Sequence, residues 1–114
     1  MPYISAVVNV QISAEKEEII KTKLGKAVTL IPGKSESRLM LSFTENNALY
    51  FAGEKNKPIA FVEVKLFGSA TKEAYNNLTA EISKILNDEL KIPQRNIYVK
   101  YEEVANWGCN GSNF

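Results

Sequence analysis

The sequence predicts a single α/β domain of the α+β type, built from two strand–helix–strand (βαβ) units that share one four-stranded sheet. Its 114 residues suit one domain, spanning 1–114. Apolar strand-like segments alternate with segments of helical periodicity. The two halves also repeat each other at residue level. The first strands open with Pro2-Tyr3-Ile4 and Pro58-Ile59-Ala60, and the helices end with Ile31-Pro32 and Ile92-Pro93.

The first unit begins with a strand and continues into an amphipathic helix. The segment Tyr3–Val10 is rich in β-branched and apolar residues, which is typical of a strand. Ser13 is expected to cap the helix, since glutamates follow it in the first turns. Pro32-Gly33 should end the helix. One apolar stripe recurs at helical spacing: Ile20, Leu24, Ala27, Val28 and Ile31.

Two shorter strands are expected before the second unit. Leu39–Phe43 alternates between larger apolar residues and others, as a strand does. Ala48–Ala52 (ALYFA) predicts a short edge strand that ends at Gly53 and is free to pair with a neighbouring subunit. The charged segment Glu54–Lys57 then forms a loop.

The second unit repeats the plan of the first. A strand starts at Pro58 and ends at Phe67-Gly68, and Thr71 is expected to cap the following helix. The last strand of the unit is Asn96–Tyr101. The helix presents an apolar face composed of Tyr75, Leu78, Ile82, Ile85 and Leu86, with Leu90 near its end.

Two helices can cover only one face of a four-stranded sheet. The strand after Pro58 nevertheless carries apolar residues at both parities, with Ile59 and Phe61 on one side and Ala60 and Val62 on the other. A sheet that is apolar on both faces in so small a chain favours oligomerisation.

Composition excludes several classes of function. The 14 basic and 13 acidic residues nearly cancel, which argues against nucleic acid or an anionic membrane as partner. The chain has no histidine, so zinc and other metal sites and serine–histidine catalysis are not expected. Its single cysteine and the lack of an apolar leader or membrane span predict a cytoplasmic protein.

Pro2 is a candidate catalytic group. Removal of Met1 would leave its nitrogen as a secondary amine on a rigid ring, which no side chain supplies. Such an amine acts as a base near pH 7 only if its pKa is lowered by an apolar environment or a nearby cation. Lys34, which follows Pro32-Gly33, could supply that cation.

The chain resembles the macrophage migration inhibitory factor branch of the tautomerase superfamily, which includes D-dopachrome tautomerase. The resemblance covers the whole chain in order. It rests on the segments Met1-Pro2 with its strand, Pro32-Gly33-Lys34, Tyr50–Gly53, Phe67-Gly68, Ile97–Tyr101 and the tail Asn106–Phe114.

This resemblance implies a trimer of pseudo-twofold subunits, with the sheets around a central barrel and the active sites between subunits. It implies a cofactor-independent keto–enol tautomerase, an isomerase of the phenylpyruvate or dopachrome type that acts on a small α-keto acid or aromatic enol. Pro2 would be the catalytic acid and base. Lys34 would hold the carboxylate or enolate, and Phe67 would contact the substrate through its backbone amide.

The resemblance also places Tyr98, Trp107 and Lys100 at the substrate. Tyr98 would reach the site across the subunit interface, and Trp107 would form a wall. Tyr3, which is adjacent to Pro2, is expected to border the mouth of the pocket. Lys100 stands where the mammalian cytokine has an asparagine; a second cation there would lower the Pro2 pKa further and favour an anionic substrate.

Other departures limit what carries over. The mammalian Cys-x-x-Cys is replaced by Phe61–Val64 (FVEV), so thiol-redox activity is not expected, and Cys109 is interpreted as structural or incidental. Dehalogenation, hydration and decarboxylation in another branch recruit arginines. Arg38 and Arg95 are not expected at pocket positions, so these reactions rank below tautomerisation.

An alternative role is a secreted, cytokine-like ligand that acts on a receptor, with a vestigial or secondary tautomerase site. Family members leave cells without a signal peptide, so this alternative stays open beside the cytoplasmic enzyme. Receptor binding that survives mutation of Pro2 would distinguish the ligand from the enzyme.

Overall fold

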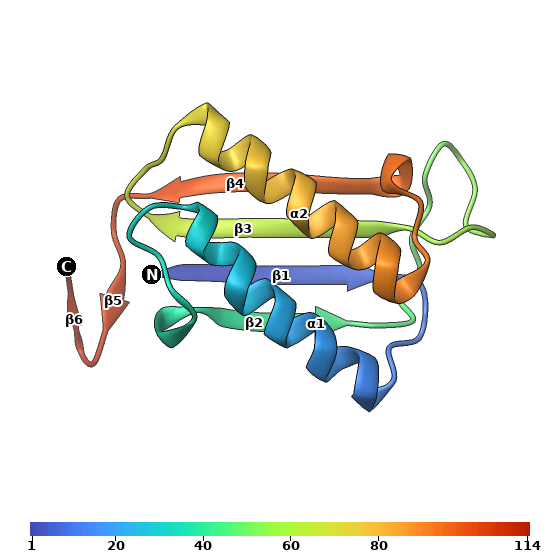
Figure 1. Ribbon diagram of the computed structural model, residues 1–114, viewed down its shortest axis with the longest axis horizontal. Coiled ribbons are helices and arrows are strands. Elements are labelled where there is room, and N and C mark those ends of the chain that lie inside the picture. The colour runs from blue at the N-terminus through green and yellow to red at the C-terminus, as the bar shows by residue number, and fades with distance from the viewer.

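The computed structural model describes all of residues 1–114 and has two layers, in which two helices cover one face of a four-stranded sheet (Figure 1). Both termini lie at the same end of the sheet. The sheet contains β1 (Pro2–Val8), β2 (Met40–Thr44), β3 (Ala60–Phe67) and β4 (Ile97–Val104), and the helices are α1 (Ala14–Ala27) and α2 (Lys72–Leu90). There are three single 3₁₀ turns. The turn η1 (Val28–Leu30) follows α1, η2 (Glu36–Arg38) precedes β2, and η3 (Gln94–Asn96) precedes β4.

The strand order confirms the predicted duplication. The sheet runs β2-β1-β3-β4, with β1 parallel to β2 and β3 parallel to β4. The two central strands are antiparallel, and Pro2 lies opposite Leu66. The two βαβ units are therefore related by a pseudo-twofold axis between β1 and β3, with one helix per unit on the same face.

Both predicted helix caps are present. The Ser13 hydroxyl accepts from the Lys16 amide at 3.1 Å, and the Thr71 hydroxyl accepts from the Ala74 amide at 3.1 Å. The first helix is shorter than its apolar stripe, because the chain tightens into η1 at Val28 before Pro32-Gly33. The second ends at Lys91, which adopts a left-handed conformation and bonds back to the Asn87 carbonyl.

The core lies between the helices and one face of the sheet. Alternate residues of the central strands point into it, from Pro2 to Val8 in β1 and from Ala60 to Leu66 in β3. The predicted helical stripes supply the opposing layer. Its fully buried side chains include Ile20, Leu24, Leu78, Ile82, Ile85 and Leu86.

The other face of the sheet is mixed, so the prediction of a second apolar face is wrong for its middle. Across the central strands Ser5 lies opposite Glu63, and Glu63 lies opposite Lys100. Apolar side chains are confined to the ends of this face, where Val7, Phe61 and Tyr98 are in register. The open face of the sheet is thus half-buried and partly charged, and it is not uniformly apolar.

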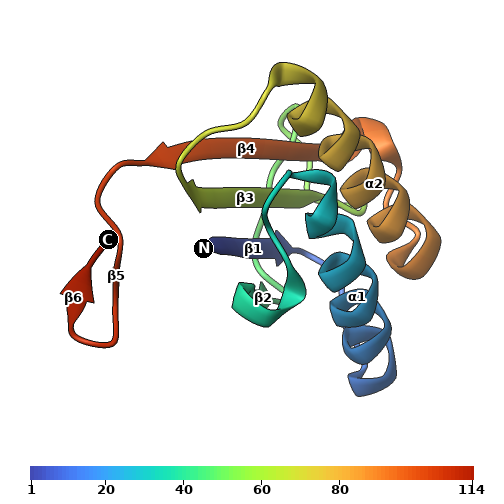
Figure 2. The ribbon, with the colours of Figure 1, turned by 60° about the vertical axis from the view of Figure 1, so that its left-hand side comes forward.

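Ala48–Ala52 does not form the predicted edge strand in the single chain. Its only ladder contact is an isolated bridge from Phe51 to Glu54 across a tight turn, because no strand of the same chain lies alongside it. The tail instead forms a small hairpin of β5 (Gly108–Cys109) and β6 (Ser112–Asn113), which stands clear of the two layers (Figure 2).

Candidate functional site

A cavity of about 670 Å³ opens at the end of the sheet where β1 begins. Its apolar walls come from Met1, Pro2, Tyr3, Met40 and Trp107, and Ser37, Arg38, Gly108 and Cys109 complete the lining. It therefore combines a mostly apolar wall with very few charged groups, as small-molecule sites do.

Three segments far apart in the sequence build this cavity. The parallel register of β1 and β2 pairs Tyr3 with Met40, so η2 and its Arg38 lie beside the N-terminus. The tail turns back after β4 as a hairpin that is closed by a hydrogen bond from the Phe114 amide to the Trp107 carbonyl at 3.0 Å. The Phe67 and Phe114 rings, whose centroids are 5.7 Å apart, anchor this tail to the end of β3.

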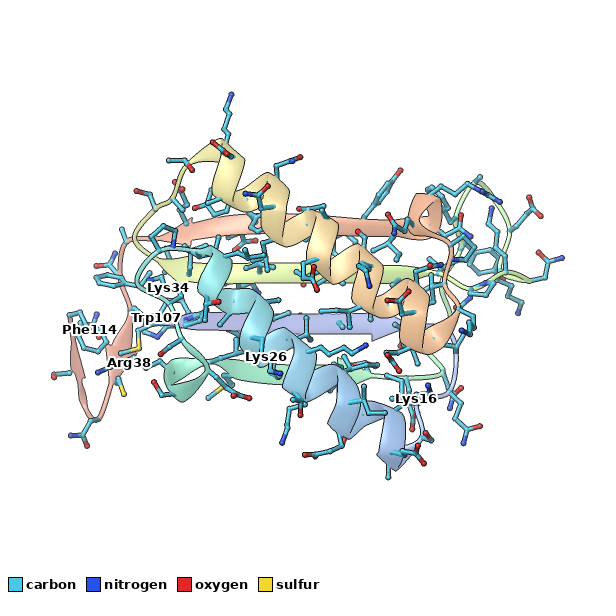
Figure 3. The ribbon with its side chains drawn as sticks, in the orientation of Figure 1. Lys16, Lys26, Lys34, Arg38, Trp107 and Phe114 are labelled. Carbon is cyan, nitrogen blue, oxygen red and sulfur yellow. The ribbon has the colours of Figure 1, made fainter.

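Lys34 lies near the edge of the cavity and links the loop after α1 to the end of β3. Its Nζ donates to the Phe67 carbonyl at 2.8 Å, while the Phe67 amide donates to the Met1 carbonyl at 3.1 Å. Gly33, at φ 82°, provides the left-handed turn that leads to this lysine. Figure 3 shows Lys34, Arg38, Trp107 and Phe114 at one end of the molecule, and Lys16 at the other end of α1.

The α-amine at this end is electrostatically perturbed. Burial, a hydrogen bond with Lys34 and the positive charges of Lys34 and Arg38 lower the pKa of the Met1 amine from 8.0 to about 6. An amine in this place is therefore largely neutral at pH 7, as a general base must be.

The sequence-predicted residues thus fall into two groups. Pro2 and Trp107 line the cavity, as does Tyr3, while Lys34 and Phe67 brace its edge. Tyr98 lies at the opposite end of the sheet, because it pairs with Phe61 and, through it, with Val7. Val7 lies five positions after Pro2 along β1, which is roughly 16 Å.

Lys100 is also remote from Pro2 within one chain. It lies on the open face, where its Nζ contacts Glu102 at 2.8 Å and Glu63 at 3.8 Å. The hydrogen bond with Glu102 is the largest cause of the raised Lys100 pKa. Within the chain this lysine is paired, not free for a substrate.

Arg38 lies in the cavity lining, so the expectation that it is outside the pocket is wrong. It lines the cavity beside Pro2, whereas Arg95 lies in η3, before β4. Cys109 also lines the cavity and is exposed. Arg38 comes two residues before β2, the strand that lies parallel to β1. Its proximity to Pro2 follows only from the register between these two strands, which the local sequence does not give.

No cluster of three or more metal-ligating acidic, cysteine or histidine side chains occurs in the structure. Neither helix combines the length and apolarity that crossing a membrane requires.

Comparison with known proteins agrees with this arrangement. The family model described as macrophage migration inhibitory factor matches residues 1–114. A macrophage migration inhibitory factor homologue of Brugia malayi is 28% identical, covering 100% of this chain and 99% of the relative.

Two solved structures extend the comparison to the fold. The crystal structure of Leishmania major MIF2 superposes with a TM-score of 0.92 at 28% identity, covering 100% of this chain and 97% of that one. The Prochlorococcus marinus homologue gives a TM-score of 0.88 at 27% identity, covering 98% of each. This chain belongs to the macrophage migration inhibitory factor family, within the tautomerase superfamily.

Proposed function

We propose that the chain, after loss of Met1, is a cofactor-independent keto–enol tautomerase that acts on a phenylpyruvate-like α-keto acid or a dopachrome-like enol. The observation that carries this proposal is the environment of the N-terminus. The N-terminus opens on an apolar cavity, and burial together with Lys34 and Arg38 lowers the pKa of the Met1 amine to about 6. We expect the same environment to lower the pKa of the Pro2 amine once Met1 is removed.

The chemistry follows from that environment. The neutral Pro2 nitrogen takes a proton from one atom of the keto–enol system, and the resulting prolyl ammonium returns it at the other, so no proton is gained or lost overall. The cationic Lys34 and Arg38 disfavour the ammonium and stabilise negative charge on the enolate. Trp107 and Met40 offer apolar surface to an aromatic ring.

Processing is a condition of this mechanism. While Met1 is attached, the Pro2 nitrogen belongs to an amide and has no basicity. The Met1 carbonyl, fixed by the Phe67 amide at 3.1 Å, occupies space next to the future amine. Removal of Met1 both creates the base and enlarges the site.

A homotrimer is part of the proposal. Edge strands β2 and β4 each leave one backbone edge unpaired, and the open face lacks a covering layer. Tyr98 is about 59% exposed at the far end of the sheet and would serve a neighbouring copy's site rather than its own. Light scattering should give about three times the 12.7 kDa chain mass, and a 12.7 kDa particle would contradict the trimer.

The test of the activity is the Pro2→Gly variant. Glycine also permits removal of Met1 but supplies a primary, flexible amine, so we expect tautomerisation of phenylpyruvate to fall by about 100-fold or more. Intact mass should confirm loss of Met1 in both proteins. Equal activity of wild type and variant would remove Pro2 from the mechanism.

Family membership supports a second candidate function, that of a ligand for a receptor. Its distinguishing measurement is receptor binding by the Pro2→Gly variant: binding that persists after activity is lost would assign the two roles to different surfaces.

A further inference from the structure

Arg38 contributes the only charged side chain that lines the cavity. No carboxylate forms an ion pair with it, although Glu36 belongs to the same 3₁₀ turn. Its one side-chain contact is a long 4.0 Å approach of Nη1 to the Met1 sulfur. The guanidinium is therefore a cation at an apolar site with no anionic partner of its own.

Lys34 is placed differently. Its ammonium is engaged by the Phe67 carbonyl at 2.8 Å and does not line the cavity. This contact uses one of the three ammonium donors and braces the loop against the end of β3. Arg38, by contrast, lines the cavity and has its whole guanidinium free of anionic partners. The two cations thus have different positions: Lys34 braces its loop against the end of β3, and Arg38 faces the cavity.

We propose that Arg38 is the principal group that binds the carboxylate of the substrate in this cavity, so that the site selects anionic aromatic keto acids over their neutral esters. The inference rests on the proposed function and assigns specificity within that same site. A guanidinium offers two parallel N–H donors that match a carboxylate, which an ammonium cannot do.

The rest of the cavity fits this orientation. With the carboxylate at Arg38, an aromatic ring reaches the apolar surface of Trp107 and Met40. Loss of Met1 removes the sulfur that lies 4.0 Å from Nη1 and frees the guanidinium. Lys34 remains a cation near the N-terminal amine and still holds the Phe67 carbonyl.

The test compares Arg38→Leu with wild type on phenylpyruvate and on its methyl ester. Losing a charge-assisted contact should lower the acid-to-ester ratio of kcat/KM by about 10- to 100-fold, mainly through KM for the acid. Arg38→Lys should restore part of the ratio. Arg95→Leu, which removes the only other arginine, is the matched control and should leave the ratio at its wild-type value.

Binding of unreactive analogues makes the test independent of turnover. In calorimetry, Arg38→Leu should weaken 3-phenylpropionate by about 10- to 100-fold and 3-phenylpropionamide far less. An unchanged acid-to-ester ratio and unchanged carboxylate binding in Arg38→Leu would overturn the inference, as would the same losses in Arg95→Leu. If wild type turns over neither substrate, the proposed function fails, and the calorimetry still decides the role of Arg38.

Discussion

The two central strands begin in corresponding places of the duplicated fold, yet their surroundings differ. At the start of β1 the chain begins, and a cavity of about 670 Å³ opens beside Arg38. At the start of β3 the chain arrives from a loop, and the Asn96 side chain closes the corner by donating to the Pro58 carbonyl at 3.0 Å. The hollow there is only about 180 Å³.

The last residues of the two 3₁₀ turns show the same contrast. Arg38 ends η2 and is exposed to the cavity, whereas Asn96 ends η3 and is buried with its hydrogen bond satisfied. Both units follow the same backbone plan, so the proposed function depends on features other than the fold. The end at β1 has a chain terminus, an open corner and, in its cavity lining, an arginine without an anionic partner, and the end at β3 has none of these.

Mutation at the closed end, where β3 begins, should change the stability of the fold. Truncating Asn96 to alanine removes the buried donor to Pro58 and leaves the carbonyl without that partner, so we expect the free energy of unfolding to fall by about 1–3 kcal/mol. Urea denaturation measures this loss. Asn77→Ala, at an exposed position of α2, is the control. A change at Asn96 no larger than at Asn77 would show that the corner is not held in this way.

The open end should respond through its pH profile. Lys34 lowers the pKa of the Met1 amine, and we expect it to act in the same way on the Pro2 amine of the processed chain. Lys34→Met should therefore raise the pKa of the Pro2 amine toward the ordinary value by up to about one pH unit. Because the base acts when neutral, the acid limb of kcat/KM moves to higher pH, and activity below the limb falls by up to about tenfold.

Lys26→Met is the matched control for Lys34→Met, since Lys26 is exposed in the last turn of α1. An acid limb that stays in place in Lys34→Met, or that moves to lower pH, would show that Lys34 does not set the pKa of the amine.

The smallest expected effect concerns the chain that still carries Met1. Its amine pKa is about 6 in the folded state against an ordinary 8.0, so between these values the unfolded chain binds the extra proton. The free energy of unfolding should therefore rise with pH across this window, by an amount kept small through solvent screening. An N-terminally acetylated chain should lose this slope; an identical slope in both would place the titration elsewhere.

Local chemistry predicted most of the fold. The caps at Ser13 and Thr71 and the helical stripes locate both helices, since capping and periodicity are properties of short segments. The prediction of a strand at Ala48–Ala52 was wrong because composition alone favours a strand there, whereas strand formation needs a pairing partner that the single chain does not offer. The tail hairpin of β5 and β6 was not predicted either, because its sequence lacks the alternation of apolar and polar residues that indicates strands.

The site was only partly predictable for a related reason. Pro2, Lys34 and Trp107 could be named from the resemblance, and the structure places them at or beside one cavity. Arg38 was missed because its proximity to Pro2 depends on the register between β1 and β2, which pairs residues 37 positions apart. Tyr98 lies far from Pro2 within one chain, in keeping with the resemblance, which assigns it to a neighbouring subunit, and Lys100 is paired with Glu102 and Glu63 on the open face.

The most direct test of the account compares the processed protein with a chain that keeps one extra residue before Pro2, prepared by cleavage of a fusion. The two differ only in whether the proline nitrogen is an amine. We predict phenylpyruvate tautomerisation by the processed protein and activity lower by about 100-fold or more in the extended one. Equal activity of the two chains would contradict the claim that the free amine of Pro2 is the catalytic base.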